Sequence, residues 1–148
     1  AAESTAEKPY IVAVVARHGE RRDYVDRDAG GNWVATAKRP FDPPLSPHGM
    51  EQGYALGRHL VNELERLNLP PVSSIYSSPL LRCRQTAASA RLGMVNELEG
   101  GKDVPPMVQV EIALVETICE DWYRSWAMKD SDGTWGQRLP SDTLINPS

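Results

Sequence analysis

The sequence has few cysteines, no long apolar run and no cluster of positive charge. Its two cysteines, Cys83 and Cys119, are too few for a disulfide framework, and no CxxC or Cys/His spacing indicates a zinc site. No apolar run approaches the roughly 18 residues that a membrane span needs. The formal net charge of −4 argues against a protein whose main activity is to bind nucleic acid. Any binding of anions must therefore depend on a local site.

The length and composition fit one globular domain. The chain has 148 residues, of which 41% are hydrophobic and 24% are charged, and this is enough to bury a core. We expect a single domain over residues 1–148, with residues 1–9 as an N-terminal extension. The opening AAESTAEKPY has no initiator Met and no apolar signal core. We therefore expect a cytoplasmic protein, with an organelle as the alternative if the N-terminus is processed.

Apolar periodicity predicts alternating strands and helices, which is the pattern of an α/β domain with a mainly parallel sheet. The run YIVAVVA is rich in β-branched residues and too short for a helix, so it predicts a central strand buried on both faces. Ser46 followed by Pro47 is typical of a helix start, and the pair Pro70 and Pro71 ends that helix. Along this helix we expect one apolar stripe, because its apolar residues recur at helical spacing: Tyr54, Leu60, Val61, Leu64 and Leu67. In chain order we expect a strand over 10–16, a long loop over 17–45, a helix over 46–67, a strand over 72–77, a helix from 79 and a strand over 107–110.

Charged residues follow the predicted strands at the edge where ligands usually bind. Right-handed crossovers make the three strands parallel, so their carboxyl ends share one edge, and open α/β sheets bind ligands outside that edge. Arg17, His18 and Arg21 follow the first strand, Arg82 lies in the first turn of the helix after the second, and Glu116 follows the third. We expect these residues to form one site.

Their chemistry is coherent for a phosphate ester. An imidazole with a pKa of about 6.5 is largely neutral at neutral pH, so His18 can attack phosphorus with a ring lone pair. The guanidinium groups of Arg17, Arg21 and Arg82 can hold the phosphoryl oxygens bidentately, and the amides at a helix N-terminus add to the attraction at Arg82. Glu116 can give a proton to the leaving alkoxide and then activate water. No metal or organic cofactor is implied, because arginines take the place of the magnesium of many phosphoryl-transfer sites.

Three motifs in order resemble those of the histidine phosphatase (phosphoglycerate mutase-like) superfamily. Residues 17–21 read RHGER and resemble its RHGE signature, residues 42–46 read DPPLS and with Gly49 resemble its LSxxG element, and residues 77–87 read SSPLLRCRQTA and resemble its SSPxxRxxQTA element. With the aspartate that follows RHGER by two residues, they look most like the branch that contains the suppressor-of-T-cell-receptor-signalling phosphatases. The resemblance covers roughly residues 10–116.

The resemblance implies a three-layer α/β/α fold and a phosphatase that works through a phosphohistidine. It implies that His18 accepts the phosphoryl group, that Arg17, Arg21 and Arg82 bind phosphate, and that Glu116, in the segment VEIALVE, donates the proton. The expected substrates are phosphorylated small molecules or phosphoproteins. Members of the family also carry a second histidine after a late strand. No histidine follows Glu116 here, so we expect a domain that is incomplete at its C-terminus.

Two other functions stay open. The absence of the second histidine favours a catalytically inactive module that serves binding or assembly, whereas the intact RHGER motif and Arg82 favour an enzyme. A phosphoglycerate mutase is less favoured, because mutases typically continue into SxWN and RFxGWxD, whereas this chain reads RRDYVDRDAGGNW. A domain without its final strands would expose an unpaired sheet edge, so we also expect a protein partner or a homo-oligomer.

Some residues near the motifs compete for these roles. Arg22 can replace Arg21 by a shift of one residue, and the spacing from His18 favours Arg21. Only its place in the motif favours Glu116 over neighbouring carboxylates. We expect ordinary structural or surface roles for Arg84, His48, His59, Cys83, Glu111, Glu120, Trp122 and Trp126.

Overall fold

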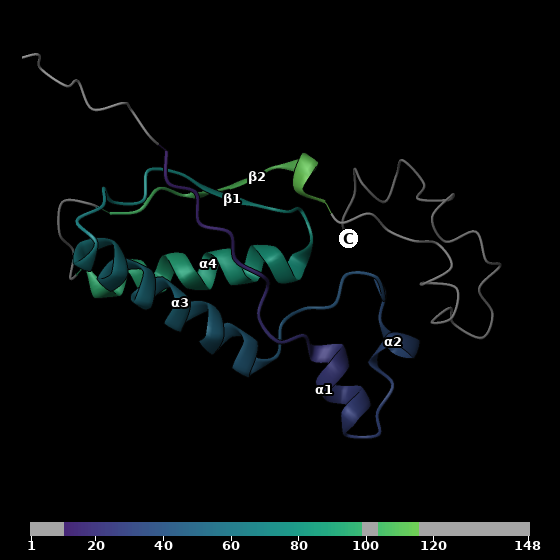
Figure 1. The fold of residues 1–148 in the computed structure, drawn as a ribbon. Helices are drawn as coiled ribbons and strands as arrows, with labels where there is room; N and C mark the ends of the chain where they lie inside the picture. Colours follow the sequence, from purple (N-terminus) through teal and green to yellow (C-terminus); the bar gives the residue numbers. More distant parts are fainter. Residues whose placement is uncertain (1–10, 99–103, 116–148) are drawn as a thin grey trace, which may run out of the picture.

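The computed structural model describes residues 11–98 and 104–115 and has a mixed α/β fold (Figure 1). In these residues, two parallel strands pack on a long helix, and a second long helix packs on the first. In chain order the elements are α1 (Arg22–Asp28), α2 (Trp33–Thr36), α3 (Pro47–Arg66), β1 (Ile75–Ser77), α4 (Leu81–Glu97), β2 (Val108–Val110) and the 3-10 helix η1 (Ile112–Leu114). None of the helices in this part of the chain is long and apolar enough to cross a bilayer.

The two strands confirm the predicted parallel pairing. Ile75 lies opposite Val108 and Ser77 lies opposite Val110, so the carboxyl ends of β1 and β2 share one edge. The Glu111 amide donates to the Ser77 carbonyl over 2.9 Å and extends the ladder past β2. Both strands are shorter than the predicted ranges 72–77 and 107–110.

Helix α3 begins and ends where local chemistry predicts. The Ser46 hydroxyl accepts from the Gly49 amide over 2.9 Å, which satisfies one of the amides at the helix N-terminus, and Pro47 occupies the first turn without loss of a hydrogen bond. The helix ends at Arg66, two residues before Asn68, which has a positive φ of 50°. Serine, proline and asparagine at these positions therefore set the length of α3.

Glycines form the most buried face of α3, and two of them, Gly53 and Gly57, pack on α4. The buried residues of α3 are Gly49, Gly53 and Gly57, at intervals of four residues along one side of the helix. An ideal Cβ on Gly57 would lie 1.8 Å from the Ala90 carbonyl oxygen of α4. The two helix backbones therefore approach too closely for any larger residue at this position.

The predicted apolar stripe of α3 is not its most buried face. Its members Tyr54, Leu60, Val61 and Leu64 are half-buried, and Leu67 after the helix is exposed. Apolar periodicity identifies the side of a helix with the larger hydrophobic residues. It does not identify a contact that depends on the absence of side chains.

The prediction of a central strand over residues 10–16 is wrong for 11–16, the part of it that the structure describes. No strand forms there, and Ile11 and Val15 are each 95% exposed. A strand buried on both faces needs hydrogen-bonded neighbours, and the described strands pair only with each other. An apolar run of β-branched residues indicates the propensity for a strand but not the presence of these neighbours.

The prediction of a loop over residues 17–45 is also wrong, because this segment contains α1 and α2. Helix α1 carries Asp23 in its first turn and Arg27 in its last, where each charge complements the helix dipole. The Asn32 side chain caps α2 by accepting from the Ala35 amide over 3.2 Å. Short helices have no long apolar stripe, so periodicity does not reveal them in a segment rich in glycine, proline and charged residues.

Candidate active site

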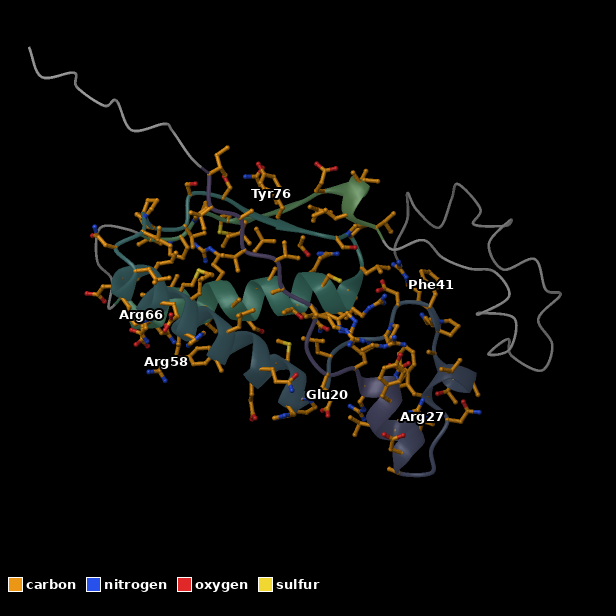
Figure 2. All side chains as sticks on the ribbon, viewed as in Figure 1. Glu20, Arg27, Phe41, Arg58, Arg66 and Tyr76 are labelled. Carbon is orange, nitrogen blue, oxygen red and sulfur yellow. The ribbon has the colours of Figure 1, made fainter. Side chains whose placement is uncertain are left out.

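The segment that carries His18 is held against α3 and α4 by its backbone. The Gly19 amide donates to the Thr86 hydroxyl of α4 over 3.0 Å. The Glu20 amide donates to the Gln52 side chain of α3 over 2.8 Å, and the Glu20 carbonyl accepts from the Ser46 amide over 2.9 Å. Figure 2 shows Glu20 beside the N-terminal end of α3. All three sequence motifs therefore meet around His18.

Two glycines allow this close approach. An ideal Cβ on Gly19 would lie 2.4 Å from the Gly49 carbonyl oxygen, and one on Gly49 would lie 2.2 Å from the Glu20 carbonyl oxygen. Real Cβ atoms do not approach other atoms so closely, so both positions require glycine. The glycine of RHGER and the glycine after DPPLS are therefore parts of one packing contact.

The hydrogen bond of His18 fixes the state of its ring. Its Nδ1 lies 2.8 Å from the Gly19 carbonyl oxygen, and because a carbonyl only accepts, Nδ1 must carry the hydrogen of the neutral ring. The Nε2 atom then has the lone pair. The ring is half-buried, with its reactive nitrogen in the form that a nucleophile requires.

Burial and nearby positive charge keep His18 neutral. Burial lowers its pKa below the ordinary value of about 6.5, and the positive charges of Arg82, Arg17 and Arg21 lower it further. The bond to the Gly19 carbonyl opposes the shift. The structure therefore brings His18 into the field of the three arginines that the sequence predicts as phosphate ligands.

Arg82 is the most enclosed of these arginines. It lies in the first turn of α4 with 2% of its surface exposed, and its Nη1 donates to the Phe41 carbonyl over 3.5 Å. The Thr86 hydroxyl that accepts from Gly19 donates in turn to the Arg82 carbonyl over 2.8 Å. One threonine thus links the His18 segment to the turn of α4 that carries Arg82.

Arg21 is oriented by two neighbours in its own helix region. Its Nε and Nη2 donate to the Asp23 carboxylate over 3.0 and 2.6 Å, and its Nη1 donates to the Tyr24 hydroxyl over 2.9 Å. The guanidinium also lies over the Tyr24 ring, 4.1 Å from its centre. In the sequence, the aspartate after RHGER served only to support the family resemblance, and its contact with Arg21 was not predicted. The spacing of two residues between Arg21 and Asp23 could have indicated this ion pair.

Arg17 and Arg22 differ from Arg21 in burial. Arg21 is 7% exposed, whereas Arg17 and Arg22 are both exposed. Arg17 affects His18 through its charge, and Arg22 takes part in the local fold through its amide, which donates to the Pro44 carbonyl over 2.9 Å. The positive charge of Arg21 also lowers the pKa of His18.

The DPPLS segment joins α4 to the same site. The Asp42 carboxylate accepts from the Leu81 amide at the start of α4 over 2.6 Å, and the Leu45 amide donates to the Gln85 side chain over 2.8 Å. Arg39 pairs with the buried Asp42 over 3.2 Å. Asp42 therefore caps α4 from 39 residues away, and no local pattern around α4 predicts it.

The structure describes only some of the remaining candidates. Glu116 lies outside the described residues, as do Cys119, Glu120, Trp122 and Trp126. Glu111 is exposed and caps η1 by accepting from the Ala113 amide over 2.9 Å. The residues predicted to be on the surface, Arg84, His48 and His59, are exposed, and Cys83 is half-buried. The described part of the chain contains no group of His, Cys, Asp and Glu side chains that could hold a metal ion.

Comparison with known proteins identifies the family. The model of the histidine phosphatase superfamily, branch 1, matches residues 13–103, which include His18, all three arginines and all three motifs. No curated protein matched the chain. Because the family match covers more than half of the 148 residues, the chain belongs to branch 1 of the histidine phosphatase superfamily.

Proposed function

We propose that the chain is a phosphatase that hydrolyses phosphate monoesters through a phosphohistidine on His18. One observation carries the proposal: the Nδ1 bond to Gly19 leaves the lone pair on Nε2, within the field of Arg82, Arg17 and Arg21. A phosphate ester is an anion that must be neutralised before a neutral nucleophile can attack it. This site has both the nucleophile and the neutralising charge.

In the first step of the proposed reaction, the Nε2 lone pair attacks phosphorus and the bond from phosphorus to the ester oxygen breaks. The electron pair of that bond leaves with the alkoxide, which takes a proton from Glu116. The arginines stabilise the charge on the transferring phosphoryl oxygens. In the second step, Glu116 takes a proton from water, the water oxygen attacks phosphorus, and the phosphorus–nitrogen bond breaks to restore neutral His18.

The family motifs also support a finer placement. The RHGER, DPPLS and SSPLLRCRQTA motifs favour the branch of the suppressor-of-T-cell-receptor-signalling phosphatases and a three-layer α/β/α domain. The proposed substrates are phosphoproteins or phosphorylated small molecules. We expect the segment between Arg21 and Leu45 to determine the substrate specificity. Within it, Asp42 accepts from the Leu81 amide at the start of α4, and the Phe41 carbonyl accepts from Arg82.

The second candidate is a binding module without catalysis. The observation in its favour is that, among the described residues, the two histidines other than His18 are His48 and His59, and both are exposed on α3. We expect neither to take the place of the second histidine of the family. Such a module would keep the arginines and bind phosphate without turning over an ester.

Turnover of p-nitrophenyl phosphate tests the proposal. We expect the full chain to release inorganic phosphate, His18→Ala to lower kcat by at least about 10³-fold as loss of a nucleophile does, and His48→Ala to retain wild-type activity. Rapid quenching in alkaline detergent with labelled substrate should trap a phosphoprotein that is stable in base, labile in acid and absent in His18→Ala. Activity in His18→Ala would overturn the assignment of the nucleophile, whereas phosphate binding without turnover in the wild type would favour the binding module.

A further inference from the structure

A cavity lies between α2, the 41–45 segment and the start of α4. Its volume is about 360 Å³, which is within the range of small-ligand sites. Its apolar lining residues are Trp33, Ala37, Pro44, Pro79 and Leu81. Its charged lining residues are Asp42 and three cations, Lys38, Arg39 and Arg84. We call this space the Trp33 cavity.

The charge of the Trp33 cavity favours an anion. Three cationic side chains and one carboxylate, Asp42, line it, so the lining has a formal charge of +2. Asp42 is already engaged, because it accepts from the Leu81 amide and pairs with Arg39. Of the ion pairs among the described residues, none involves Lys38 or Arg84. The two positive charges that Asp42 does not balance are therefore those of Lys38 and Arg84.

The cavity is a direct neighbour of the phosphate-binding arginines. Leu81 lines the cavity, and the next residue of α4 is Arg82. Asp42 lines it as well, and the preceding residue, Phe41, accepts a hydrogen bond from the Arg82 guanidinium. Figure 2 shows Phe41 near the N-terminal end of α4. The cavity and the Arg82 guanidinium therefore both adjoin the short segment of Phe41 and Asp42.

We propose that the Trp33 cavity binds a second anionic group of the substrate, which rests on the proposed phosphatase function. Arg82, Arg17 and Arg21 hold the phosphate that is cleaved, and Lys38 and Arg84 hold a carboxylate or a second phosphate. The apolar part of the substrate between the two groups packs on Trp33 and Leu81. The shared chemistry is a substrate with two separated anionic groups, as in a bisphosphorylated small molecule or a phosphopeptide with a nearby acidic side chain.

The double variant Lys38→Gln/Arg84→Gln tests this proposal in the full chain. Three substrates are compared: p-nitrophenyl phosphate, which has one anionic group, fructose 1,6-bisphosphate, and a phosphotyrosine peptide with an acidic side chain next to the phosphorylated residue. We expect KM for at least one substrate with two anionic groups to rise about five- to tenfold, as for the loss of two exposed charge contacts, with kcat unchanged. KM for p-nitrophenyl phosphate should not change. The effect should diminish at high salt, since exposed charges are screened.

Arg66→Gln is the matched control, because Arg66 is an exposed arginine at the opposite end of α3 from Glu20 (Figure 2). A rise in KM for the bisphosphate alone identifies a small-molecule source of the anion, and a rise for the peptide alone identifies an acidic peptide. An equal change for all three substrates, or no change for any, overturns the proposal. If the wild-type chain turns over none of them, the phosphatase proposal fails, and calorimetric titration with the same compounds tests the cavity independently: equal affinity of wild type and double variant then overturns it.

Discussion

Each arginine of the site is held in a different way, and this determines what its replacement should do. Arg21 is oriented by the Asp23 carboxylate and by the Tyr24 ring and hydroxyl, Arg82 is enclosed at the start of α4, and Arg17 is exposed. A buried guanidinium in a low-dielectric site stabilises a transition-state charge more than an exposed one. We therefore expect Arg82 to matter most for the chemical step.

Replacement of Arg82 by lysine separates charge from geometry. Arg82→Lys keeps the positive charge but loses the planar fork that binds two phosphoryl oxygens, so we expect kcat/KM for p-nitrophenyl phosphate to fall about 10²-fold. Arg84→Lys is the matched control on the same helix, and it should leave that value unchanged. Circular dichroism of both variants checks that α4 is intact. Wild-type turnover by Arg82→Lys would show that charge alone is sufficient at this position.

At the scale of secondary structure, elements with local signals could be predicted from the sequence, and elements that depend on distant partners could not. Ser46, Pro47 and the residues after Arg66 define α3 through caps and turns within a few residues of its ends. The strand pairing followed from the short crossover through α4. The prediction of a strand over residues 11–16 failed, because a buried strand depends on hydrogen-bonded neighbours that an apolar run does not specify.

The same division holds for the site. The motifs predicted His18 and the arginines as site residues from residue type and order. They did not predict that Asp23 orients Arg21, that Asp42 caps α4, or that Thr86 holds Gly19. The contacts of Asp42 and Thr86 span 39 and 67 residues, so they exist only in the folded chain.

On the glycine face of α3, we expect a glycine-to-alanine substitution to lower the stability of the protein, whereas in an exposed helix it raises it. In an exposed helix, glycine to alanine stabilises by up to about 1 kcal/mol. At Gly57 the added Cβ would meet the Ala90 carbonyl of α4, so we expect Gly57→Ala to lower the free energy of unfolding by about 2–3 kcal/mol through overpacking. Urea unfolding of the full chain measures the change.

The control for Gly57→Ala lies on the exposed side of the same helix. Ala55 is exposed, so Ala55→Gly should cost only the propensity difference, about 0.5–1 kcal/mol. If Gly57→Ala stabilises the protein as an exposed site would, then α3 and α4 do not approach each other as closely as the glycine contacts indicate.

At the scale of the whole molecule, the site and the fold depend on the same contacts. The His18 segment is tied to α3 through Gln52 and to α4 through Thr86, and the DPPLS segment is tied to α4 through Gln85. The arrangement of the site therefore depends on the packing of α3 and α4. A change in the charge of His18 should then affect the stability of the whole described unit.

The pKa of His18 gives the sign of that effect. Burial and the three arginines lower the pKa of His18 in the folded chain, whereas the unfolded chain has the ordinary value of about 6.5. Between these two pH values the unfolded state binds more protons than the folded state, so stability rises with pH through this window and is lost as the pH falls through it. We expect the free energy of unfolding, measured with urea from about pH 5 to about pH 7, to decrease toward the acid side.

His18→Gln removes the titrating group and should flatten the curve within that window. Direct titration of His18 by NMR should place its pKa below about 6.5, and Arg17→Gln should raise it, because the positive charge of Arg17 lowers it in the wild type. A slope that is the same in wild type and His18→Gln would mean that His18 is not held neutral by the fold. A protonated imidazole has no lone pair on Nε2, so such a result would also count against the proposed attack of His18 on phosphorus.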